Sequence, residues 1–287
     1  MKKTCPLPKT PPIGQESASL GHGSTEQMNL PPLKFLRALA APVVRASTRP
    51  LFVDAEPLSS LADRLKARGV RPVIPLAKAS GYRFTKIGPG GDSPHQLAST
   101  VYLQTGSRAA VGEFLTSFLE THRPKSLAEM LFSSDDPSLY PLTGLHPLTR
   151  FQPWDPLIER TAGFLGQSEI GQVIPDRITK KAERQIAVLE SLQRYGYRPE
   201  AYRGGYITGY FVVHEGDYAF IVRNGMHRLG VLAALGTTEI AVRLSKDRPS
   251  LIDASGVSNW AHVRSGFCSH DLALRMIRRH FGQPQRG

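Results

Sequence analysis

The stretch 206–244 constrains the fold of this chain more than any other part of the sequence. Within it, strand-like and helical apolar patterns alternate and are separated by turn residues. The strand-like runs are 210–213, 218–222 and 240–244. The turn residues are Glu215-Gly216-Asp217, Asn224-Gly225 and Gly236. Between Met226 and Leu235 the apolar residues recur at helical spacing. The stretch therefore predicts a hairpin, a tight glycine turn, a helix and a further strand of the same sheet.

The joint between the second strand and the helix, 223–228, is the best candidate for chemistry. Its Asn224-Gly225 pair readily adopts positive φ and leads directly into a helix N-terminus. Such a turn leaves backbone N–H groups without helical partners at the positive end of the helix dipole, which suits an anion. His227 and Arg228 add side-chain donors on the first turn. The residues alone leave a second interpretation open, an ordinary joint with a solvated Arg228 and a His227 bonded to a backbone carbonyl.

A family resemblance favours the anion site. The segment NGMHRLGVLAALG followed by EIAVRL resembles the glycine-histidine-arginine turn, helix and strand of the ParB/sulfiredoxin-like fold. The preceding segment IAVLESLQRYGYRP is similar to the helix before that turn, so the resemblance covers about 186–244. It implies an α+β fold, a small mixed β-sheet with packed helices. It also implies that Gly225, His227 and Arg228 bind nucleotide phosphates, with Arg223 and Asn224 beside them.

The sequence departs from families of this fold at two positions and matches a second motif of the fold more weakly. Met226 stands where sulfiredoxins carry a catalytic Cys, and Asn224 stands where the free-serine kinases of this fold carry an acidic residue. Val263-Arg264 resembles the second ParB nucleotide motif, which adds Arg264 to the predicted nucleotide-binding residues, although a surface role for Arg264 fits equally well. Segments near 95–131, the Pro153-Trp154 connector and 260–273 are similar to a group of bacterial ParB-like proteins associated with surface-polysaccharide gene sets. That resemblance covers roughly 90–281 and implies no particular activity.

The resemblance implies a nucleoside triphosphate, ATP or CTP with Mg²⁺, as the ligand, and phosphoryl transfer or hydrolysis as the activity. Phosphoryl transfer needs cationic donors, a metal and a carboxylate that orients the nucleophile. The sequence does not identify that carboxylate, the acceptor substrate or a dedicated metal site. The nearby acidic residues are Glu169, Asp176, Glu183 and Glu190. A nucleotide-responsive scaffold without turnover is the alternative, and DNA binding ranks last because too few residues follow Leu244 for the helix-turn-helix domain of partition ParB proteins.

The organisation of the rest is predicted from composition and periodicity. Residues 1–30, rich in Pro, Gly, Ser and Thr, are expected to form a mobile tail. Residues 31–150 are expected to be mainly helical, and 151–287 to form the ParB/sulfiredoxin-like domain. The segment 33–45 is basic and amphipathic, so it either lies on an anionic membrane surface or packs on its own domain. His95 and His122 have no partner at ligand spacing and are interpreted as structural.

Charge and cysteine content narrow the class of protein. The formal net charge of +12 is spread over both halves of the chain and favours anionic partners, although many proteins with such a surface bind none. Two cysteines, Cys5 and Cys268, exclude a disulfide scaffold or a cysteine-rich metal site. The N-terminus lacks the apolar core of a secretory signal, and no apolar run is long enough to span a membrane. We therefore expect a cytoplasmic protein.

Overall fold

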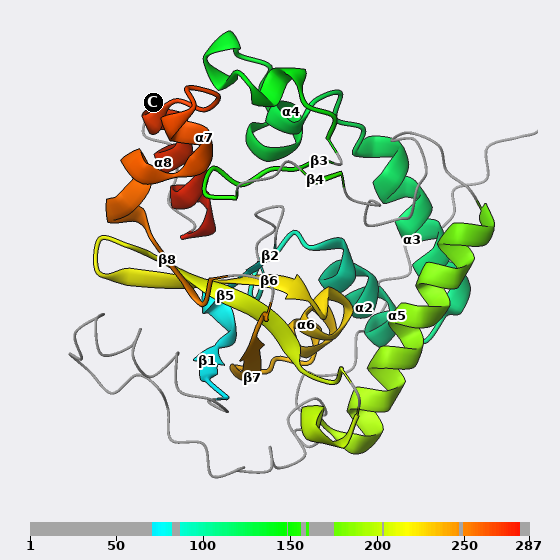
Figure 1. Cartoon of the computed structure of the whole chain (residues 1–287). Helices are drawn as coiled ribbons and strands as arrows, with labels where there is room; N and C mark the ends of the chain where they lie inside the picture. Colours follow the sequence, from blue (N-terminus) through cyan, green and yellow to red (C-terminus); the bar gives the residue numbers. More distant parts are fainter. Residues whose placement is uncertain are drawn as a thin grey trace, which may run out of the picture. The chain divides into compact units, whose positions relative to one another are not determined.

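The computed structural model describes residues 71–81, 87–147, 149–155, 159–160, 175–202, 204–246 and 249–281 (Figure 1). The predicted tail 1–30 and the amphipathic segment 33–45 lie outside these residues. The described part is an α+β structure that combines a mixed sheet with several helices. None of the helices within the described ranges is long and apolar enough to cross a membrane.

The hairpin predicted from the sequence forms the centre of the sheet. The strands are β1 (Val73–Pro75), β2 (Ala79–Gly81), β5 (Ile207–His214), β6 (Asp217–Asn224), β7 (Glu239–Leu244) and β8 (Leu251–Asp253). They follow the order β1-β7-β5-β6-β2, and β8 pairs with the second half of β5. β5 and β6 are antiparallel, whereas β7 pairs in parallel with the first half of β5. A separate two-stranded ladder joins β3 (Thr149–Arg150) to β4 (Glu159–Arg160).

The connection between β1 and β2 shows that the sheet is curled. These strands stand at opposite ends of the strand order, yet only the 3-10 turn Leu76–Lys78 joins them. Three residues span at most about 10 Å, so the two edges of the sheet must approach each other. The backbone N–H of Leu76 donates to the carbonyl of Thr238, just before β7, at 2.7 Å. The strands thus wrap around a core instead of lying flat.

Side-chain alternation along β5 and β6 divides the core in two. Phe211 and Phe220 belong to the cluster inside the curl, together with Leu229 of α6 (Met226–Ala234). Tyr210 and Ile221 face the other way and belong to a second cluster. That second cluster includes residues of α4 (Leu127–Phe132), of the 3-10 turn Ala254–Asn259 and of α8 (His270–His280). The short helix α7 (Ala261–Arg264) packs against the same cluster through Val263. Burial of both sheet faces explains why the strands read as nearly continuous apolar runs.

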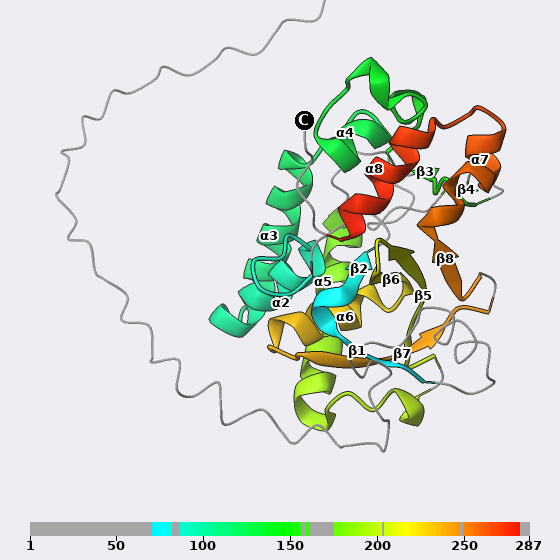
Figure 2. The ribbon, with the colours of Figure 1, turned by 90° about the vertical axis from the view of Figure 1, so that its left-hand side faces the viewer.

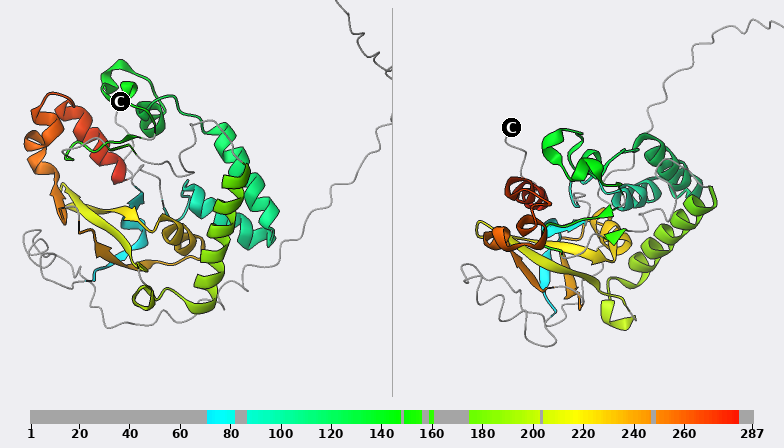
Figure 3. Two further views of the ribbon diagram at one scale, coloured as in Figure 1. Left: turned by 45° about the vertical axis from the view of Figure 1, so that its right-hand side comes forward. Right: turned by 45° about the horizontal axis from the view of Figure 1, so that its top comes forward.

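The remaining helices form one group, and two of them contact α6. The group consists of α2 (Pro94–Thr105), α3 (Arg108–Thr121) and α5 (Pro175–Tyr195). A third apolar cluster joins α2, α3 and α5, and Figures 2 and 3 show α5 running beside α3. α2 and α6 are in close contact, because a Cβ added to Gly230 would lie 2.6 Å from Cβ of His95. The chain also forms 3-10 turns at Pro137–Leu139, Leu142–Gly144 and Pro199–Ala201.

The structure confirms the local predictions for 206–244. The strands predicted at 210–213, 218–222 and 240–244 share one sheet, and the helix predicted at 226–235 packs on it as α6. The region 31–150, predicted to be mainly helical, also supplies β1 and β2 to this sheet. The sheet therefore crosses the predicted boundary near 150.

Candidate functional site

Gly225 forms the turn between β6 and α6 in a conformation that other residues rarely adopt. Its φ is 97°, and an added Cβ would lie 3.1 Å from both Cα and Cγ1 of Ile207 on β5. α6 starts at the next residue and has no side-chain cap. The N–H groups of its first turn therefore have no partners within the helix, as predicted.

His227 is partly buried and joins a hydrogen-bonded cluster with the buried residues His95, Ser99 and Gln185. Its Nδ1 lies 2.5 Å from Oε1 of Gln185 on α5, and the same oxygen lies 3.1 Å from Nδ1 of His95 on α2. Nε2 of Gln185 donates to the carbonyl of His95 at 3.1 Å and to Oγ of Ser99 at 2.7 Å, which fixes the amide orientation. Since an amide oxygen can only accept, both imidazoles carry their proton on Nδ1.

Positive charge surrounds this histidine. Burial, followed by the charges of Arg184, Lys181 and Arg228, lowers the pKa of His227 to about 4. Burial also lowers the pKa of Lys181, and the Arg184 charge lowers it further. Lys181 lies one helical turn before Gln185, so it projects from the same face of α5. α5 and α6 therefore bring cations together at the first turn of α6.

Arg228 holds the backbone that leads into β5. Its Nη1 donates to the carbonyl oxygens of Gly204 at 2.7 Å and Gly205 at 2.6 Å. Burial lowers the pKa of its half-buried guanidinium. Tyr197 reinforces the same region, because its hydroxyl accepts from the N–H of Ile207 at 3.1 Å and donates to the carbonyl of Ala241 at 2.9 Å. The guanidinium thus has a structural contact that the sequence did not reveal, and its predicted phosphate contact stays a prediction.

The other predicted site residues are spread over the fold. Arg223 is partly buried on β6, two residues before Gly225 and not on α6. Asn224 is exposed and lines a pocket formed with the residues before and within β5. Arg264 ends α7, in the layer that covers the opposite face of the sheet from α6. The first turn of α6 is therefore brought together with α5, through Lys181 and Arg184, and not with Arg264.

We assign no Mg²⁺ site among the described residues. Within the ranges given above, no group of three His, Cys, Asp or Glu side chains is placed to hold a metal. Of the acidic residues considered from the sequence, Glu190 pairs with Arg108 at 3.0 Å and accepts from Tyr102 at 2.8 Å. Asp176 and Glu183 are exposed on α5, and Glu169 lies outside the described residues. We therefore derive no chemical step through a metal.

Comparison with known proteins finds no relative. No protein-family model, no curated protein and no solved structure matches the chain. The site is consequently defined by its own geometry. Its distinctive residues, Gln185, Lys181 and Arg184, lie on α5, and no motif in the sequence points to those side chains.

Proposed function

We propose that the protein binds a nucleoside polyphosphate, with the phosphates at the first turn of α6 and beside Lys181 and Arg184 of α5. The observation that carries the proposal is the convergence of cations on this turn. Every charged group that perturbs the pKa of His227 is cationic. An anion bound there would be attracted by these side chains, by the N–H groups of an uncapped helix start and by the helix dipole.

The choice of a nucleotide rests on the resemblance to the ParB/sulfiredoxin-like fold, which we include in the proposal. The order of elements supports it: the long helix α5, the hairpin β5–β6, the Gly225 turn, α6 and β7 follow one another along the chain. In families of that fold the equivalent turn binds nucleotide phosphates. His227 would then orient the turn through Gln185, because its Nδ1 is already bonded there.

The proposal covers binding and does not extend to turnover. Phosphoryl transfer requires a carboxylate or metal near the transferred group. The described residues around α6 offer cations, amides and backbone N–H groups, and we assign no catalytic residue. A nucleotide-responsive binding protein is accordingly the function that the geometry supports best.

Thermal shift and calorimetric titration with ATP, CTP, GTP and UTP, with and without Mg²⁺, test this function. A nucleotide that binds only the folded protein must raise its melting temperature. Lys181→Gln and Arg184→Gln each remove one charge, and we expect each to weaken binding about fivefold, since partly exposed charges contribute about 1 kcal/mol. Lys180→Gln, the same change at an exposed neighbour on α5, is the matched control and should bind normally.

Two results would contradict the proposal. In the first, none of the four nucleotides shifts the melting curve of the wild-type protein. In the second, a nucleotide binds but Lys181→Gln and Arg184→Gln bind it as tightly as Lys180→Gln does, which would place the ligand away from α5 and α6.

A further inference from the structure

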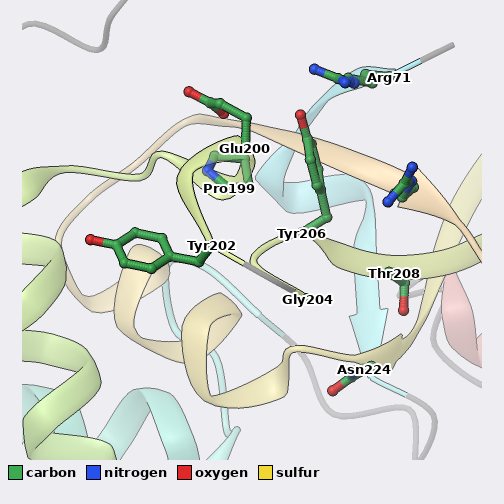
Figure 4. Close-up of a pocket in the computed structure, with 9 residues that line it drawn as sticks. Arg71, Pro199, Glu200, Tyr202, Gly204, Tyr206, Thr208 and Asn224 are labelled. Carbon is green, nitrogen blue, oxygen red and sulfur yellow. The ribbon is translucent and has the colours of Figure 1, made fainter. Parts of the chain in front are cut away.

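Strand register places a row of polar side chains across one end of the sheet. Thr208 of β5 pairs with Asn224 of β6 on one side and with Arg243 of β7 on the other. β1 and β7 are antiparallel, and Val73 of β1 pairs with Ala241 of β7. Two residues further along the same register, on the same face of the sheet, Arg71 lies opposite Arg243. Asn224, Thr208, Arg243 and Arg71 all line one pocket, shown in Figure 4.

Tyr206 holds the two arginines at this pocket. The guanidinium carbon of Arg71 lies 5.5 Å from the ring centroid of Tyr206, and that of Arg243 lies 5.7 Å from it. The ring is 8% exposed, whereas both arginines are exposed. Cation–π contact fixes the two guanidiniums, although like charges on neighbouring strands repel each other. Glu200 is the one carboxylate among the described lining residues, so the lining carries a net positive charge.

The size and donors of the pocket define what it can take. Its volume of about 310 Å³ is at the lower end of small-molecule sites. Arginine pairs in a forked geometry with the oxygens of phosphate or carboxylate. The Asn224 amide and Thr208 hydroxyl can both donate and accept, and the Glu200 carboxylate accepts from hydroxyl groups. A small organic anion with several hydroxyl groups matches these donors and acceptors.

We infer that this pocket is a second binding site, for a small hydroxylated organic anion whose phosphate or carboxylate lies between Arg71 and Arg243. The inference rests on observations other than those behind the proposed nucleotide site, which the pocket adjoins at Asn224. The residues Lys181, Arg184 and His227 do not line the pocket. Gly204, which does, is held by Arg228 through its carbonyl oxygen. A bound anion would also relieve the repulsion between the two guanidiniums.

Calorimetric titration of the full chain with ribose 5-phosphate, ribonate and ribose tests the site. These probes share a sugar skeleton and differ in the anionic group. We expect at least one of the two anions to bind and ribose to bind at least tenfold more weakly, because it lacks the charged group. Arg71→Gln and Arg243→Gln should each weaken the anion about tenfold or more. Arg198→Gln, an exposed arginine just before Pro199 that does not line the pocket, should leave binding unchanged.

The two anions identify the group that is recognised. Binding of ribose 5-phosphate alone assigns the site to a phosphate, and binding of ribonate alone assigns it to a carboxylate. Failure of both anions to bind would overturn the inference, as would equal affinity in Arg198→Gln and Arg71→Gln. Arg243 lies within β7, so Arg243→Gln could lower the stability of the protein as well as its affinity for the anion. Arg71 precedes β1 and is exposed, so the effect of Arg71→Gln on anion binding can still be measured in that case. Lys181→Gln should not affect these titrations, which distinguishes failure here from failure of the nucleotide site.

Discussion

The imidazole rings of His95 and His227 meet edge to face, with their centroids 4.1 Å apart. Both direct Nδ1 to the same oxygen of Gln185, so three helices, α2, α5 and α6, meet at one amide. His95 is buried, and its pKa is lowered well below the usual value, first by burial and then by His227. The arrangement requires two neutral rings, because two charged rings in contact would repel each other in a poorly solvated place.

Stability should therefore fall on mild acidification. The pKa of His227 is about 4 in the folded protein and 6.5 in the unfolded chain, so between these values the unfolded chain binds more protons. The free energy of unfolding is then highest above pH 6.5 and falls as the pH approaches 4. We expect His227 alone to contribute a loss of about 3 kcal/mol, measured by urea denaturation at pH 7, 6, 5 and 4.

A variant can measure the contribution of His227 to the pH dependence of stability separately from that of other histidines. Burial also lowers the pKa of His280 to about 3, so it adds to the same slope. His227→Asn should therefore reduce the pH dependence of stability without abolishing it. Identical slopes for wild type and His227→Asn would show that His227 does not titrate as its surroundings imply.

Replacing Gln185 should cost more stability than any single contact suggests. Gln185→Leu removes the acceptor of both imidazole N–H groups and the donor to Ser99, so each of these groups loses a hydrogen bond. Each lost bond costs about 1–3 kcal/mol, so we expect a loss of about 3 kcal/mol or more. Gln193→Leu makes the same change at an exposed position of α5 and should be nearly neutral. Urea midpoints of the two variants that agree within error would contradict the role assigned to Gln185.

Turn residues and apolar spacing predicted those parts of the site that are determined by residues close together in the sequence. Asn224-Gly225 indicated a positive-φ turn, and Gly225 has φ 97°. The apolar spacing from Met226 onward predicted α6, and the hairpin followed from its turn residues. Each of these features is determined within a few positions of chain, which is the range over which turn chemistry and periodicity act.

The contacts that define the site are distant in sequence and could not be predicted in this way. His95 was interpreted as a lone structural histidine because its partner, Gln185, is 90 positions away. Arg228 was expected to face a ligand, and only the fold brings the carbonyl oxygens of Gly204 and Gly205 to its guanidinium. The pair of Arg71 and Arg243 depends on the register between β1 and β7, which no local pattern specifies.

The close contact between α2 and α6 predicts that Gly230→Ala is destabilising. The added methyl carbon would lie 2.6 Å from Cβ of His95 and 2.8 Å from the backbone N of Gln96, so one helix must move. We expect a loss of about 1–3 kcal/mol, the usual effect of overpacking. Gly112→Ala on α3 is the matched control, because nothing lies within 4 Å of the added carbon, and it should be stabilising by about 0.5–1 kcal/mol. Thermal melts in which the two variants change in the same direction would contradict the close crossing.

Replacing Arg228 should lower the stability of the protein even when no ligand is present. Arg228→Ala removes the donor to the carbonyl oxygens of Gly204 and Gly205, and we expect a loss of about 1.5–3 kcal/mol in the absence of nucleotide. Arg228→Lys keeps the charge and a donor group but replaces the longer, planar guanidinium, so it should recover only part of that loss. Urea denaturation without ligand measures this effect, and titration under conditions where each variant is folded measures binding. If Arg228→Ala unfolds at the wild-type urea concentration, the two carbonyl contacts contribute no stability, and a loss of nucleotide affinity in that variant would then assign Arg228 to the phosphate.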